Sequence, residues 1–153
     1  MVIQRWQSVL LLCTVVCMAC FSFMSLGQVQ EAGFYYNFFT LGFRLAEEPT
    51  AGQAPEFAST WYFFAVSLLS AILPLIAIFT FKNFKLQKNL CLLTMLMLAC
   101  VICIGAVIAY GGPYNVEWGS LVCAPFIALI ATIMAYQRIK ADERLLRSAD
   151  RLR

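Results

Sequence analysis

The sequence predicts an all-α membrane protein with four transmembrane helices arranged in two hairpins. Hydrophobic residues make up 62% of the chain and charged residues only 12%, and the mean hydropathy is +0.80. A soluble domain has roughly 25% charged residues to cover its surface. Four apolar runs are each long enough to cross the hydrocarbon core of a bilayer, and the 153 residues form a single domain spanning 1–153. Nearly all basic residues fall in the segments that four crossings would bring to one side.

The first predicted span covers about residues 6–26. Its uncharged part from Val9 to Leu26 is 18 residues long, whereas the apolar region of a secretory signal peptide has about 7–15 residues. Small residues at Ser25 and Gly27 would suit cleavage before Gln28. We nevertheless predict a retained helix, because the run is long enough to cross the bilayer.

Residues 27–58 form the predicted outer loop, the longest polar segment of the chain. Its aromatic stretch GFYYNFFTLGF suits a short hairpin or a loop lying on the lipid headgroups. Two interpretations are open, a surface that binds a partner and a cap over the outer end of the protein's own bundle. We favour the cap. The stretch EEPTAGQAPE that follows is rich in turn residues and predicts a connector.

Three further spans are predicted at about residues 59–81, 89–110 and 120–137. Pro74 in the second span cannot donate a hydrogen bond to the carbonyl of Ser70, which predicts a bend. The fourth span carries small residues on one helical face, and these predict close helix packing: Ala124, Ala128, Ala131 and Ala135. The tail, residues 138–153, is predicted to continue as a helix with an apolar stripe at Ala141, Leu145, Ala149 and Leu152.

The basic residues predict the orientation. The segment from Phe81 to Asn89 lies between the second and third spans and carries three lysines. With four crossings, every basic residue except Arg44 falls on the side of the two termini and this segment. Positive residues in short loops stay in the cytoplasm, so both termini are predicted to be cytoplasmic.

This basic face also predicts the partners. Each Lys or Arg near an anionic leaflet contributes about 1 kcal/mol of attraction, so lipid headgroups are the expected ligand. A homo-oligomer or a membrane-protein partner is also open, whereas nucleic acid is disfavoured because no soluble module presents the charges. The residues expected to contact anionic lipid or a partner are Lys82, Lys85, Lys88, Arg138, Lys140, Arg144, Arg147, Arg151 and Arg153.

The residue types present disfavour several chemistries. The chain has no histidine, which removes the usual general base and the commonest metal ligand. No predicted span carries a carboxylate or an amine, the groups that proton relays and ion-coupled transporters use inside membranes. We therefore predict no cofactor and no metal, and we place a transporter or channel third among the possible functions.

Two Cys-x-x-Cys pairs are the candidate reactive groups, namely Cys17 with Cys20 and Cys100 with Cys103. They could serve a membrane thiol-disulfide redox protein, although that chemistry needs a thiol within reach of a soluble partner. A zinc site of four thiolates is disfavoured, because it would leave net negative charge in hydrocarbon. We favour cysteine as a small packing residue, with two packing faces expected: Cys13, Cys17 and Cys20 on the first span, and Ala99, Cys103 and Ala106 on the third.

Three segments carry a resemblance to a known family: the opening IQRWQS, the middle KNFKLQKNLC and the ending IKADERLLRSADRLR. Along the whole chain the sequence resembles the small bacterial four-helix membrane proteins grouped as domain-of-unknown-function family 4293. The resemblance implies a multi-pass protein of the inner membrane. The family has no assigned activity, so the resemblance supplies no catalytic residues, and the cysteine pairs are not part of it.

The sequence-based hypothesis is therefore a non-enzymatic structural or adaptor component of the membrane that acts through its basic cytoplasmic face. The alternative is a thiol-disulfide redox protein that uses Cys17, Cys20, Cys100 and Cys103.

Overall fold

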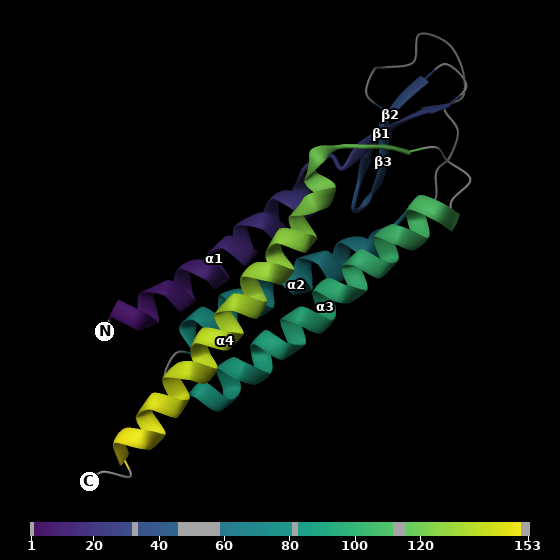
Figure 1. The fold of residues 1–153 in the computed structure, drawn as a ribbon. Coiled ribbons are helices and arrows are strands. Elements are labelled where there is room, and N and C mark those ends of the chain that lie inside the picture. The colour runs from purple at the N-terminus through teal and green to yellow at the C-terminus, as the bar shows by residue number, and fades with distance from the viewer. Residues whose placement is uncertain (1, 32–33, 46–58, 81–82, 112–115, 151–153) are drawn as a thin grey trace.

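The computed structural model describes residues 2–31, 34–45, 59–80, 83–111 and 116–150. Within these residues the chain forms four long helices and a small sheet (Figure 1). The helices are α1 (Val2–Phe23), α2 (Trp61–Phe79), α3 (Phe84–Gly111) and α4 (Ala124–Asp150), with a short 3-10 helix η1 (Ser120–Cys123) before the last. The strands are β1 (Gly27–Glu31), β2 (Phe34–Phe39), β3 (Gly42–Leu45) and β4 (Val116–Trp118).

Each of the four helices is long and apolar enough to cross a membrane, as predicted. The helices form a ring in which α1 and α3 each pack against both α2 and α4, so that α1 and α3 are diagonally opposite. The start of α1 and the end of α4 lie at one end of this bundle, and the sheet lies at the other (Figure 1). Because each helix has a neighbour on either side in the ring, the packing does not single out the two predicted hairpins.

Apolar side chains cover the outside of the helices as well as the core. Leu12 of α1, Phe79 of α2 and Leu92 of α3 are all more than half exposed. A helix that is hydrophobic on every side is typical of a membrane span. The side that faces the bundle is distinguished by small residues instead, and the predicted packing face of α4 is confirmed: Ala124, Ala128, Ala131 and Ala135 are all buried.

Hydroxyl groups are buried between the helices and are bonded there. The Thr14 and Thr132 hydroxyls, on α1 and α4, lie 3.2 Å apart, and the Ser22 hydroxyl donates to Ser67 Oγ of α2 at 3.1 Å. Each such bond between membrane helices contributes about 0.6 kcal/mol. Together with the small residues, these pairs specify which faces of the helices meet.

The sheet corrects the all-α prediction. Its strands are antiparallel in the order β3-β2-β1-β4, so the segment before α4 pairs with the segment after α1. The pattern of period two is present but short: on β1 the buried Val29 lies between the exposed Gln28 and Gln30, and on β2 the buried Tyr36 and Phe38 flank Asn37, which is half-buried. The strands β1 to β3 are short, and β4 has three residues and is distant in the chain, so the local sequence pattern indicates them only weakly. For this reason the sequence predicted only the hairpin that corresponds to β2 and β3.

The buried face of the sheet caps the bundle. Phe38 and Leu26 are fully buried in the same cluster as Met18 of α1 and Phe63 of α2. The Thr40 hydroxyl, at the tip of the β2–β3 hairpin, donates to the carbonyl of Ser22 at 2.8 Å. These contacts favour the cap over a free partner-binding loop, while residues 46–58 of the predicted loop lie outside the described residues.

The ends of the helices differ from the predicted spans where tertiary contacts intervene. α1 ends at Phe23 rather than near residue 26, because the chain enters the sheet there and the Leu26 amide donates to the Phe38 carbonyl. α4 continues without interruption to Asp150, so residues 138–150 of the predicted tail are helical. On this extension Ile139 is buried against the bundle, and Ala141 and Leu145 of the predicted apolar stripe are exposed.

Candidate functional sites

The most charged surface of the described chain is the end of the bundle formed by the starts of α1 and α3 and the last turns of α4. We call it the basic end. Four of its basic side chains are exposed: Lys85, Arg138, Lys140 and Arg144. Of the other predicted contact residues, Lys82, Arg151 and Arg153 lie outside the described residues, and Arg147 lies in α4 with its side chain undescribed. The four exposed cations form a surface that can attract anionic groups.

Lys88 behaves differently from these four. Its Nζ lies 2.5 Å from Glu143 Oε2 of α4, and the two side chains are only 25% and 14% exposed. The residue before Glu143 contacts α1 instead: the buried Gln7 side chain of α1 donates through Nε2 to Asp142 Oδ2. Lys88 is therefore engaged within the chain, and the extension of α4 is attached to both α1 and α3.

This pair of contacts was not predicted from the sequence. The ion pair of Glu143 with Lys88 joins two helices, and no local pattern in the sequence carries that information.

The two cysteine pairs lie on diagonally opposite helices. Cys17 and Cys20 are half-buried on α1, and Cys17 packs against the core cluster near the sheet. Cys100 and Cys103 are exposed on the outer side of α3. Among the described residues no group of three cysteine, aspartate or glutamate side chains is placed so that it could hold a metal ion.

The predicted packing faces that include cysteine are wrong in part. Ala99, Cys103 and Ala106 are exposed, and the buried face of α3 is formed instead by Cys91, Thr94, Leu98 and Val101. On α1, Cys13 is exposed, and Leu11, Thr14 and Met18 are among the positions that are buried. The physical reason is that apolar residues surround each helix, so hydrophobic periodicity does not identify the inner side. Cys91, which is fully buried, is the cysteine that does serve as a core residue.

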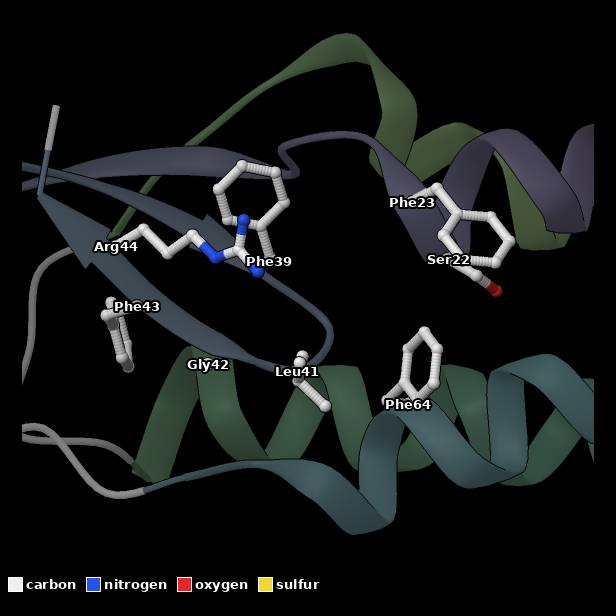
Figure 2. A pocket seen from close by; sticks show the side chains of 8 residues that line it. All are labelled: Ser22, Phe23, Phe39, Leu41, Gly42, Phe43, Arg44 and Phe64. Carbon is white, nitrogen blue, oxygen red and sulfur yellow. The ribbon is translucent and has the colours of Figure 1, made fainter.

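Two cavities lie at the sheet end of the bundle. One, of about 410 Å³, is an apolar hollow between α3 and α4 that includes Gly105 and Phe126 in its wall. The other, of about 360 Å³, lies between the β2–β3 hairpin and the facing ends of α1 and α2, and we call it the hairpin pocket (Figure 2). The residues that line the hairpin pocket are Ser22, Phe23, Phe39, Leu41, Gly42, Phe43, Arg44 and Phe64.

The hairpin pocket was not predicted as a site. Two of its features were visible in the sequence, namely the aromatic stretch around Phe39 and the position of Arg44 as the one basic residue away from the basic end. What could not be read from the sequence is that the hairpin turns back onto Phe23 and Phe64, which come from two different helices.

Taken together, the fold and its surfaces define a class: a four-helix protein able to cross a membrane several times, with a basic end and an opposite end capped by a sheet. The chain belongs to the family described as domain of unknown function DUF4293, whose sequence model matches residues 3–152, essentially the whole chain. The predicted family resemblance is thereby confirmed. A comparison with curated proteins found no match.

Proposed function

We propose that this protein is a non-enzymatic structural or adaptor component of the bacterial inner membrane, and that its basic end faces the cytoplasm. In this position the exposed side chains of Lys85, Arg138, Lys140 and Arg144 contact anionic lipid headgroups and hold the last turns of α4 at the membrane surface, where a partner can bind them. The proposal extends to the undescribed side chains of Lys82, Arg147, Arg151 and Arg153.

One contrast carries the proposal. The exposed cations of the described residues, apart from Arg44, gather at one end of the bundle, whereas each polar side chain buried in the described core is a hydroxyl or an amide. Proton relays and sites for charged substrates inside membranes use ionisable side chains. The groups able to recognise another molecule by charge are therefore concentrated at the basic end.

The contacts of α4 determine how this proposal should be tested. Deleting the whole tail from Arg138 would also remove Ile139, which is buried, and the two polar contacts made by Asp142 and Glu143. The loss of function after such a deletion could then reflect unfolding. Substituting the exposed cations alone avoids this problem, because their side chains take no part in the described core.

The test is the fourfold variant Lys85→Gln, Arg138→Gln, Lys140→Gln and Arg144→Gln. Native mass spectrometry of protein extracted in mild detergent should show anionic lipid retained by the wild type and released by the variant. At about 1 kcal/mol for each cation, each substitution should weaken the affinity for anionic lipid by about fivefold. Added salt should weaken retention by the wild type in the same direction, since exposed charges are screened.

The matched control is Glu117→Gln, which removes one exposed charge at the sheet end and should leave lipid retention at the basic end unchanged. Cross-linking in cells then tests the adaptor role: partners should be lost from the fourfold variant and kept by the control. If the fourfold variant folds, keeps all its anionic lipid and keeps its partners, the proposal is wrong.

The redox alternative has no specific support from the described residues. Cys100 and Cys103 face outward on α3, and Cys17 and Cys20 are on the helix diagonally opposite. Its test remains direct: replacing all four by Ala should abolish a thiol-dependent activity and change the redox state observed by thiol trapping. A transporter or channel remains the third candidate, to be tested by flux in reconstituted vesicles.

A further inference from the structure

We propose that the hairpin pocket binds one anionic lipid of the surrounding bilayer, with one acyl chain against Phe23, Leu41 and Phe64 and the headgroup phosphate at Arg44. This site is separate from the basic end, because it lies at the opposite end of the bundle beside the sheet (Figures 1 and 2).

The walls of the pocket are suited to an acyl chain. Apolar side chains form most of its lining, and Phe23 and Phe64, in edge-to-face contact with ring centroids 5.9 Å apart, together form one apolar wall (Figure 2). The volume of about 360 Å³ is at the lower end of the range for small-molecule sites, so there is room for part of one chain rather than two. The second chain of the lipid would remain in the bilayer.

The pocket lies where a bilayer lipid can reach it. Phe23 is 65% exposed and Leu41 is 45% exposed, and Phe23 belongs to the last turn of α1, whose outer surface is apolar. Trp61 and Tyr62, also exposed, stand in the first turn of α2 and mark the level at which aromatic residues favour the membrane–water interface. An acyl chain can therefore enter from the side while the headgroup stays at the interface.

Arg44 supplies the charge that selects the headgroup. Its guanidinium carbon lies 5.5 Å from the centroid of the Phe39 ring, so the cation is positioned at the edge of the apolar wall (Figure 2). No described acidic side chain forms an ion pair with it. A guanidinium binds phosphate oxygens through two parallel hydrogen bonds, which a lysine cannot reproduce. A zwitterionic lipid would bind less tightly, because its own ammonium group would be brought close to the Arg44 guanidinium.

The hairpin holds these groups in place. The Thr40 hydroxyl donates to the Ser22 carbonyl, and the Thr60 hydroxyl donates to the Thr40 carbonyl at 2.9 Å, so the turn is attached to both α1 and α2. Gly42 follows the turn with φ of +148°, a conformation that L side chains rarely adopt. The pocket is thus a built feature of the cap rather than a gap between mobile side chains.

The experiment measures lipid binding by native mass spectrometry, titrating phosphatidylglycerol into delipidated protein in mild detergent. Arg44→Gln should lose one binding event or weaken it by about tenfold or more, as expected for a hydrogen bond to a charged group. Arg44→Lys should recover only part of that affinity. Glu117→Gln, an exposed position on β4 that does not line the pocket, should bind as the wild type does.

Two further variants separate this site from the rest of the protein. Leu41→Trp should fill the pocket and displace the lipid while leaving Arg44 in place. The fourfold variant of the basic end should keep the event that depends on Arg44, so failure of one proposal does not imply failure of the other.

The proposal is overturned if folded Arg44→Gln binds lipid as the wild type does. It is overturned equally if phosphatidylethanolamine binds as tightly as phosphatidylglycerol, if Leu41→Trp leaves binding unchanged, or if the Arg44-dependent occupant is a free fatty acid.

Discussion

Individual polar residues determine how the last turns of α4 are held. Lys88 and Glu143 form an ion pair that is mostly shielded from water, and Gln7 of α1 donates a hydrogen bond to the adjacent Asp142 of α4. Sixteen isolated residues would make only a marginal helix in water. These contacts and the burial of Ile139 stabilise the helical extension of α4 beyond its apolar part.

We expect Glu143→Gln and Lys88→Gln each to lower the free energy of unfolding by about 1 kcal/mol, the upper end for pairs near a surface. The two substitutions remove the same interaction, so the double variant should lower the free energy of unfolding by less than the sum of the two single effects. Denaturation of the three variants in detergent, followed by circular dichroism, measures this coupling. Fully additive effects would mean that the ion pair contributes nothing.

At the scale of elements, the sheet depends on a close approach between strands. Gly27 of β1 pairs with Trp118 of β4, and a Cβ atom at Gly27 would lie 2.4 Å from the carbonyl oxygen of Glu117. Since that oxygen belongs to the backbone, it cannot move aside without displacing β4. Gly27 is therefore required for β1, which follows α1, to pair with β4, which precedes α4.

Gly27→Ala should destabilise the protein by about 1–3 kcal/mol, the usual cost of forcing extra volume into a packed site. The matched control is Gly105→Ala in α3, where the added Cβ would be 3.9 Å from the nearest side-chain atom and alanine also favours the helix. Thermal unfolding in detergent should separate the two variants. An equal stability of both would show that β4 can shift without cost.

At the scale of the whole molecule, an even number of helices brings the start of α1 and the end of α4 to the same end of the bundle (Figure 1). The exposed cations of the basic end lie there, and the sheet with Arg44 lies at the other end. A bilayer that retains positive loops on its cytoplasmic side would orient this molecule with the sheet outside.

We predict that reporters fused to either terminus will be active only in the cytoplasm, whereas a tag inserted between residues 46 and 58 will be accessible from outside intact cells. The control is a reporter fused after Ser59 in a chain truncated there, which should lie outside. A C-terminal reporter that is active outside, or termini on opposite sides, would contradict the orientation.

The sequence by itself determined the number of long apolar helices, their approximate positions and the end at which most of the cations gather. Each of these features depends on the summed hydrophobicity or charge of about 20 neighbouring residues, and such a sum does not depend on how the chain folds. The small residues of α4 also identified its buried alanine face correctly, whereas the same argument failed for Ala99, Cys103 and Ala106 on α3.

Only the tertiary structure decided which faces of the other helices are buried, that Cys91 rather than Cys103 is a core residue, and that Lys88 pairs with Glu143. It also decided that β4 joins β1 and that the hairpin closes a pocket on Phe23 and Phe64. The physical reason is that each of these features joins residues distant in the chain. A helix surrounded by lipid has no polar side to indicate its orientation, and a short strand has no stable form until its partner is present.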